Sequence, residues 1–151
     1  MASNFFSPPS YDLKNIQVSV IIPTLNEEKV IAQCLSSLGR LDFPRKYFEV
    51  ILVDNGSTDR TIETAQTFSS TLNLTIMQKD KVHISALRNL AASKASGRIL
   101  AFLDADCIVS PSWLTNASVL LAQSNVGVVG AHYLIPDNSR WVARAWYGNL
   151  P

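Results

Sequence analysis

Short apolar runs and amphipathic segments alternate along most of this chain. Four runs rich in β-branched and other apolar residues have the length and composition of strands, and they lie at 17–23, 48–53, 74–78 and 99–103. Between and after these runs, apolar residues recur every three or four positions, which predicts helices at 27–38, 58 to about 68, 85–95 and 111 to about 123. The rest of the pattern predicts a last strand at 126–134 and a helix at 140–147.

The order of these elements predicts the fold class. Four strand–helix alternations are typical of an α/β fold with a mostly parallel sheet, right-handed crossovers and helices on both faces. Because the run at 99–103 is apolar throughout, we expect that strand to be buried on both faces. Asn26, Thr58 and Ser110 are expected to cap the helices that follow them. Gly97 is expected to end a helix.

Acidic residues directly follow two of the predicted strands. Asp104 and Asp106 come just after the run at 99–103, and Asp54 begins the polar segment 54–59. Since the carboxyl ends of parallel strands meet at one edge of a sheet, we expect these carboxylates to converge. Two carboxylates one residue apart are suited to Mg²⁺ or Mn²⁺, and these ions hold phosphate oxygens. For each segment, a polar turn with capping residues is the alternative.

Composition narrows the function classes. The formal net charge is +1 and there is no basic cluster, which argues against nucleic acid as a partner. No apolar run approaches the roughly 20 residues of a membrane span, and the N-terminal residues lack the pattern of a signal peptide. Cys34 and Cys107 are not spaced as a ligand pair. Reduced thiols and a cytoplasmic protein are therefore expected, with the inner face of the membrane left open.

Glycine-rich phosphate-binding loops are absent from the sequence. No Gly-x-Gly-x-x-Gly follows the first strand, and no Gly-Lys-Thr motif occurs. The sequence therefore argues against dinucleotides and ATP bound in those ways. A metal ion is left to neutralise a bound phosphate, which again indicates Asp104 and Asp106.

In this order and at these spacings, four segments resemble family 2 glycosyltransferases of the GT-A fold, a Rossmann-like α/β fold. The segments are VSVIIPTLNEE at 18–28, VILVDNGSTD at 50–59, ALRN at 86–89 and GRILAFLDAD at 97–106. Residues 1–15 are expected to form a loose leader, and the resemblance implies a nucleotide-sugar-binding domain at 16–135. It also implies transfer of a sugar, with inversion, from a UDP-sugar or a GDP-sugar to a glycan, lipid or polysaccharide acceptor.

The resemblance implies a role for individual side chains. Asp104 and Asp106 would ligate Mn²⁺ or Mg²⁺ at the diphosphate, with Asp104 also near the ribose. Asp54 would meet the edge of the base, Glu27 the ribose or base, and Arg88 the base or phosphate. The implied nucleotide-sugar-binding residues are Pro23, Thr24, Asn26, Glu27, Asp54, Arg88, Asp104, Ala105 and Asp106.

The sequence departs from the family in one respect. Family members carry a catalytic carboxylate well downstream of the metal-binding aspartates, whereas the single acidic residue after Asp106 is Asp137, in a loop-like context. The catalytic base is therefore unknown, and 136–151 are expected to begin a truncated acceptor-side region. A non-catalytic nucleotide-sugar-binding module remains the alternative. Phosphohydrolases with an aspartyl nucleophile fit poorly, because their Asp-x-Asp-x-Thr motif belongs on the first strand, whereas Asp104 follows a later one. Nucleotidyltransferases fit poorly as well, because they need a glycine-rich basic loop after the first strand, where this chain has an acidic segment.

Overall fold

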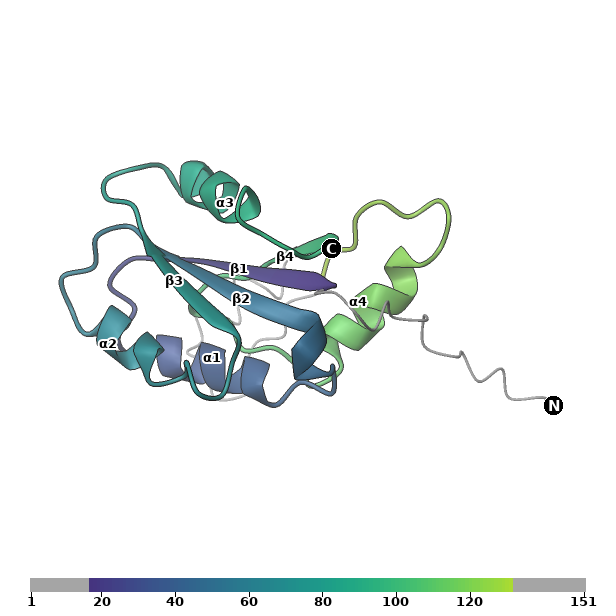
Figure 1. Ribbon diagram of the computed structural model, residues 1–151, viewed down its shortest axis with the longest axis horizontal. Helices are drawn as coiled ribbons and strands as arrows, with labels where there is room; N and C mark the ends of the chain where they lie inside the picture. Colours follow the sequence, from purple (N-terminus) through teal and green to yellow (C-terminus); the bar gives the residue numbers. More distant parts are fainter. Residues whose placement is uncertain (1–16, 132–151) are drawn as a thin grey trace, which may run out of the picture.

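The described part of the chain is built on a four-stranded parallel sheet. The computed structural model describes residues 17–131 (Figure 1). The strands run in the order β3-β2-β1-β4 and all pair in parallel. They are β1 (Val18–Thr24), β2 (Phe48–Asp54), β3 (Leu74–Gln78) and β4 (Ile99–Phe102). The predicted parallel sheet is thus confirmed, and the bounds of the third strand match the prediction.

Helices cover both faces of the sheet, as predicted. The helices are α1 (Ile31–Gly39), α2 (Thr61–Gln66), α3 (Ile84–Ala92) and α4 (Trp113–Leu121), with a short 3₁₀ turn η1 (Arg45–Tyr47) before β2. Figure 1 shows α3 on one face and α1, α2 and α4 on the other. None of the helices in residues 17–131 combines the length and the apolarity that crossing a membrane requires.

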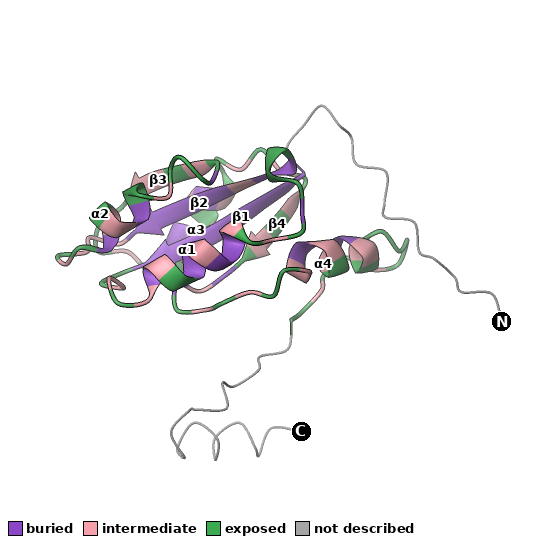
Figure 2. Cartoon of the chain, turned by 90° about the horizontal axis from the view of Figure 1, so that it is seen from below, coloured by how far each residue is buried: buried purple, intermediate pink, exposed green. Residues whose placement is uncertain are grey.

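Side chains of β1 alternate between two apolar clusters, one on each face. Val20 and Ile22 belong to the larger cluster, together with Leu35 of α1. Ile21 belongs to the smaller cluster, together with Leu87 of α3. Figure 2 shows the two central strands, β1 and β2, as almost wholly buried. This double burial explains why these strands are apolar without alternation.

The expectation that the strand at 99–103 is buried on both faces was wrong. Leu100 and Phe102 of β4 are 40% and 49% exposed. Within residues 17–131, β4 pairs with β1 alone, so it lies at an edge. Phe102 lies beside Ile21 on the α3 side of the sheet. There α3 packs over β1 and β2, and Phe102 stays exposed at the edge.

The predicted helix caps were also wrong. Helices α1, α2 and α4 begin after Val30, Arg60 and Ser112, and none of these has a side-chain capping hydrogen bond. Asn26 instead has a left-handed backbone, with φ of 55°, and accepts a hydrogen bond from the distant Thr58 N–H. Local sequence predicted that Asn26 and Thr58 would each cap the helix that follows, but these two residues bond to each other between loops.

Two expectations for the C-terminal half were wrong, and others fall outside the described residues. Gly97 does not end α3, which stops at Ala92. Residues 126–131 form no strand, contrary to the prediction for 126–134. The rest of that strand, the leader, the helix at 140–147, and Asp137 lie outside the described residues.

Gly97 provides a test of the packing between the α3–β4 connection and β1. A Cβ atom there would lie 2.6 Å from the Ser19 nitrogen and 2.7 Å from the Val18 carbonyl carbon, both in the backbone of a central strand. We expect Gly97→Ala to lower the free energy of unfolding by roughly 1–3 kcal/mol, because backbone has to move. Urea unfolding measures it.

Gly39→Ala is the matched control. A Cβ at Gly39 would have no neighbour within 4 Å, and its backbone does not need glycine. Equal stability of the two variants would contradict the close approach at Gly97.

Candidate functional site

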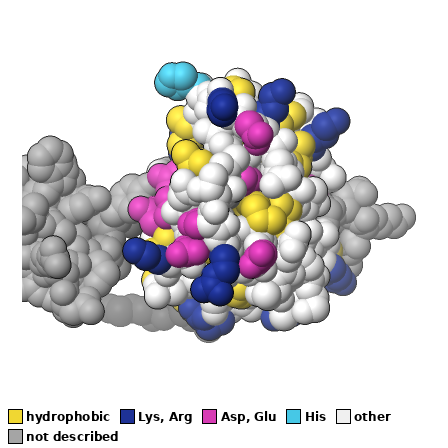
Figure 3. Space-filling model, turned by 90° about the vertical axis from the view of Figure 1, so that its left-hand side faces the viewer, with side chains coloured by type: hydrophobic (Ala, Val, Ile, Leu, Met, Phe, Trp, Pro, Cys, Tyr) yellow, Lys and Arg dark blue, Asp and Glu magenta, His cyan; other side chains and the backbone are white. Residues whose placement is uncertain are grey.

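The loops after β1, β2 and β4 meet at the carboxyl edge of the sheet, as the parallel pairing requires. Figure 3 looks onto this side of the molecule and shows acidic side chains gathered beside hydrophobic ones. A pocket of about 330 Å³ opens here, within the range of about 300–1,000 Å³ that is common for ligand sites. Its lining residues are Pro23, Thr24, Leu25, Glu27, Asn55, Ile84, Leu87, Asp104, Ala105 and Asp106.

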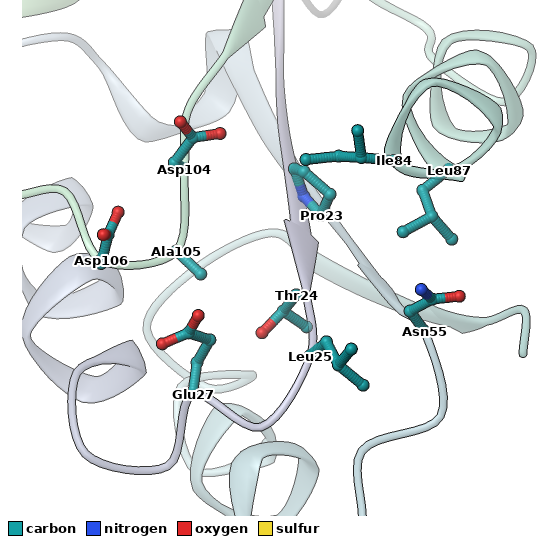
Figure 4. A pocket seen from close by; sticks show the side chains of 10 residues that line it. All are labelled: Pro23, Thr24, Leu25, Glu27, Asn55, Ile84, Leu87, Asp104, Ala105 and Asp106. Carbon is teal, nitrogen blue, oxygen red and sulfur yellow. The ribbon is translucent and has the colours of Figure 1, made fainter. Parts of the chain in front are cut away.

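The pocket has two chemically different walls. Glu27, Asp104 and Asp106 make one side acidic (Figure 4). The other side is apolar, because Ile84 and Leu87 of α3 line the pocket on the far side of Pro23. Such a pocket suits a ligand with a flat apolar part and a part that tolerates carboxylates or a cation between them.

The pocket contains six of the nine residues that the resemblance assigned to the nucleotide sugar. Asn26, Asp54 and Arg88 are not among the lining residues. The lining residues that the sequence interpretation missed are Leu25, Asn55, Ile84 and Leu87. Ile84 and Leu87 lie on the apolar face of α3, and no sequence signal shows that this face ends in a pocket.

A hydroxyl relay joins the turn after β2 to the loop after β1. The Ser57 hydroxyl donates to the Asp54 carboxylate and accepts from the Asn26 N–H at 2.8 Å. The same carboxylate also accepts from the N–H groups of Gly56 and Ser57, at 3.0 and 2.9 Å. Asp54 is fully buried, and both of its oxygens are engaged in this turn. Contact between Asp54 and a base therefore stays a prediction.

A second relay of the same form lies a few residues further on. The Thr61 hydroxyl donates to Asp59 at 2.5 Å and accepts from the Glu27 N–H at 2.7 Å. Asp59 also accepts from the N–H groups of Thr61 and Glu28. Desolvation acts to raise the pKa of Asp59, but these hydrogen bonds outweigh it and lower the pKa. We call the hydrogen bonds between residues 24–28 and 54–61 the inter-loop network.

An ion pair connects α3 to the acidic wall. The Arg88 Nη2 donates to Asp104 Oδ1 at 2.7 Å, and both side chains are partly exposed. Arg88 Nε is buried and has no hydrogen-bond partner among residues 17–131. Arg88 thus reaches the site through Asp104, whose second oxygen accepts no hydrogen bond from the described residues.

Thr24 carries the second buried polar atom without a partner among the described residues. Its hydroxyl makes no hydrogen bond, although the residue is only 4% exposed. Figure 4 shows this hydroxyl pointing toward Ala105 and Glu27, inside the pocket. An unpaired buried hydroxyl is costly, and a ligand that bonded to it would remove that cost.

The acidic wall fits a cation that is held jointly by the protein and a bound phosphate better than a metal site formed by protein side chains alone. No group of three or more metal-binding side chains occurs in residues 17–131. Asp106 is exposed, and it helps to raise the pKa of Glu27, after desolvation and together with Asp59. Mg²⁺ and Mn²⁺ often use one or two carboxylates and complete their coordination with substrate phosphates and water. Asp106, with the open oxygen of Asp104, meets that requirement.

Both cysteines are free thiols and adjoin the Asp104–Asp106 turn. Cys34 of α1 lies with its sulfur 3.9 Å from the Asp104 carbonyl oxygen, which also accepts from the Cys107 N–H. Burial chiefly raises the pKa of Cys34 to about 12. Cys34 is therefore a neutral packing residue beneath the turn.

Comparison with known proteins gives a consistent result. The sequence model described as Glycosyl transferase family 2 matches residues 19–149. Glycosyltransferase AglE of Haloferax volcanii is 41% identical over 117 residues, which cover 76% of this chain and 38% of that protein. Poly(ribitol-phosphate) beta-N-acetylglucosaminyltransferase TarS of Staphylococcus aureus is 34% identical over 116 residues, which cover 76% of this chain and 20% of that protein.

Solved structures agree with the sequence matches. Residues 1–349 of S. aureus TarS, in complex with UDP-GlcNAc, give a TM-score of 0.68 at 35% identity, covering 70% of this chain and 31% of that one. Mannosyltransferase PcManGT from Pyrobaculum calidifontis, in complex with GDP-Man and Mn²⁺, gives 0.72 at 33% identity, covering 80% and 36%. The matched part of this chain spans 38% of the length of AglE and 20% of the length of TarS.

The opposite pKa shifts of two carboxylates predict opposite effects of neutralising them. Glu27 has a pKa raised above its ordinary value of 4.5, so its ionised form destabilises the fold at pH values above 4.5. Glu27→Gln should therefore raise Tm at neutral pH. Asp59 has a pKa lowered from 3.8, so its ionised form stabilises the fold, and Asp59→Asn should lower Tm.

Thermal unfolding from neutral to acidic pH checks both variants, each serving as the control for the other. The Glu27→Gln difference should vanish below pH 4.5, where the wild-type side chain is protonated in both states. The Asp59→Asn difference should shrink below pH 3.8. Shifts of the same sign in both variants would contradict the assigned environments.

Proposed function

We propose, because this chain belongs to glycosyl transferase family 2, that its pocket binds a nucleoside-diphosphate sugar as the donor in sugar transfer. The fold is GT-A, with its all-parallel sheet and flanking helices. The observation that carries the proposal is the pocket itself, where an acidic wall and an apolar wall face each other at the carboxyl edge of the sheet.

The two walls divide the donor between them. The base lies against the apolar side chains of α3, Ile84 and Leu87, because a flat ring gains most from apolar contact. The diphosphate lies toward Asp104 and Asp106. Thr24, between the two walls, is available to a polar group of the donor. A UDP-sugar is the first candidate and a GDP-sugar the second, since TarS was solved with UDP-GlcNAc and PcManGT with GDP-Man.

We infer that binding depends on a divalent cation, Mn²⁺ or Mg²⁺. When bound, the cation neutralises charge on the diphosphate, the leaving group of the reaction. Asp106 is the principal protein ligand, because it is exposed and free of any ion pair among the described residues. Arg88 neutralises one oxygen of Asp104 and so limits repulsion between the aspartates. The Mn²⁺ in the PcManGT complex supports this inference.

Transfer with inversion is the reaction that we propose for the protein to which this donor site belongs. The acceptor hydroxyl attacks the anomeric carbon opposite the departing nucleoside diphosphate, and a base removes its proton. The residues of the pocket account for the donor side of that reaction. The acceptor, the base and the cytoplasmic location remain predictions, as do the domain limits at 16–135.

Calorimetric titration with UDP tests the cation dependence. We expect Mn²⁺ or Mg²⁺ to tighten UDP binding by about tenfold or more relative to EDTA, because the pocket otherwise sets carboxylates against phosphate. Asp106→Asn should remove most of that gain. Glu63→Gln is the matched control, since Glu63 is exposed on α2 outside the pocket. Equal UDP affinity in EDTA and Mn²⁺ would refute the metal role.

Turnover of the donor distinguishes a transferase from a non-catalytic binding module. Water can replace an absent acceptor, so we expect slow release of UDP from a UDP-sugar, well below ordinary enzymatic rates of order 1 s⁻¹. Incubation of radiolabelled UDP-sugars with wild type and with Asp106→Asn measures this release. If both proteins bind the donor and neither releases UDP above the uncatalysed rate, the chain is a binding module.

A further inference from the structure

Asn55 joins two loops through both polar atoms of its side chain. It is the first residue after β2 and lines the pocket. Its Nδ2 donates to the Val82 carbonyl oxygen at 3.0 Å, and its Oδ1 accepts from the Val82 N–H at 3.0 Å. Its own backbone N–H donates to the Thr24 carbonyl oxygen at 2.9 Å. Asn55 thus connects the ends of β1 and β2 to the loop between β3 and α3.

The β3–α3 loop needs such a tether, because little else in it is regular. Its residues Lys79–Lys81 are exposed, and Lys81 has a left-handed backbone with φ of 56°. Left-handed backbone is unfavourable for a residue with a Cβ atom. The loop keeps this shape between two anchors: the Lys79 N–H donates to the Asp54 carbonyl oxygen, and Val82 pairs with Asn55.

Val82 lies two residues before α3, and α3 supplies the apolar wall. Ile84, in the first turn of the helix, and Leu87 line the pocket. Arg88, one turn after Ile84, reaches across to Asp104. Figure 4 shows Asn55 on the Leu87 side of the pocket, opposite the two aspartates. A shift of Val82 would therefore move one wall relative to the other.

We propose that Asn55 is a positioning residue that fixes the start of α3 and thereby sets the spacing between the apolar and acidic walls for the nucleotide. The proposal rests on the proposed function of the pocket. It requires an amide, because Val82 presents one donor and one acceptor to the same side chain. An aspartate at this position would offer two acceptors and would place a carboxylate oxygen against the Val82 carbonyl oxygen.

The test compares Asn55→Asp with Asn89→Asp, the same substitution on the exposed face of α3. In the free protein, we expect trypsin to cut after Lys81 about tenfold faster in Asn55→Asp than in wild type, because the paired hydrogen bonds hold the loop closed. Asn89→Asp should be cut at the wild-type rate. Cleavage of Asn55→Asp at the wild-type rate would overturn the proposal.

UDP titration in Mn²⁺ tests the consequence for the pocket. We expect Kd to rise about tenfold in Asn55→Asp and to stay unchanged in Asn89→Asp. Gly97→Ala separates positioning from general stability: it should lower Tm without changing the Kd measured below its unfolding range. A loosened loop with unchanged Kd would overturn the positioning role.

Two further outcomes remain interpretable. If Asn55→Asp does not fold, Asn55→Ala removes the same two hydrogen bonds without adding a charge and takes its place in both measurements. If wild type binds neither UDP nor GDP, the proposed function fails, whereas the trypsin comparison still decides whether Asn55 holds the loop.

Discussion

The site depends on the inter-loop network, the hydrogen bonds that join residues 24–28 to residues 54–61. Within it, Asp54 and Asp59 each fix a hydroxyl, and each hydroxyl accepts a backbone N–H from the loop after β1. The bonds run in the other direction as well, because Asn26 accepts from the Thr58 N–H and Glu28 from the Arg60 N–H. Each loop therefore holds the other, and neither shape follows from its own sequence.

The loops after β1, β2 and β4 bring carboxylates close together at the carboxyl edge of the sheet. Two of them, Asp54 and Asp59, accept hydrogen bonds from N–H groups of their own turn and serve structure. The Glu27 carboxylate accepts no hydrogen bond from the described residues, and the Asp106 carboxylate accepts one from the Cys107 thiol at 3.7 Å. Repulsion between Glu27 and Asp106 contributes to the raised pKa of Glu27. Carboxylates with satisfied oxygens thus lie near carboxylates with free oxygens, and the free oxygens suit a cation that also holds a phosphate.

The sequence predicted what depends on periodicity and on parallel pairing. The four strands and the helices on both faces followed from apolar patterns, and the resemblance to family 2 glycosyltransferases grouped Pro23, Glu27, Asp104 and Asp106, which line one pocket. The exposure of β4 could not be predicted, because an apolar strand at the edge of a sheet has the same local pattern as one in its interior.

The sequence also could not predict the roles of residues whose hydrogen-bond partners are distant along the chain. Asn26 is a residue type that commonly caps helices, but its hydrogen-bond partner is 32 positions away. Asn55 looks like an ordinary turn residue until its pairing with Val82, 27 positions away, is seen. Asp54 belongs to a motif that implies contact with the base, which stays a prediction, and its burial and its bonds to Ser57 also give it a structural role. In each case the residue type indicated a polar role, but the sequence did not show which residue would be the hydrogen-bond partner.

We propose that the inter-loop network builds the donor pocket before the ligand binds, with Asp106 as the principal metal ligand. Diffraction from crystals grown with UDP and Mn²⁺, recorded near the manganese absorption edge, tests it most directly. We expect one anomalous peak beside Asp106, bridged to the diphosphate, with the network hydrogen bonds of Asn26 and Glu27 unchanged. A manganese peak away from Asp106, or UDP bound only after these two loops separate, would contradict it.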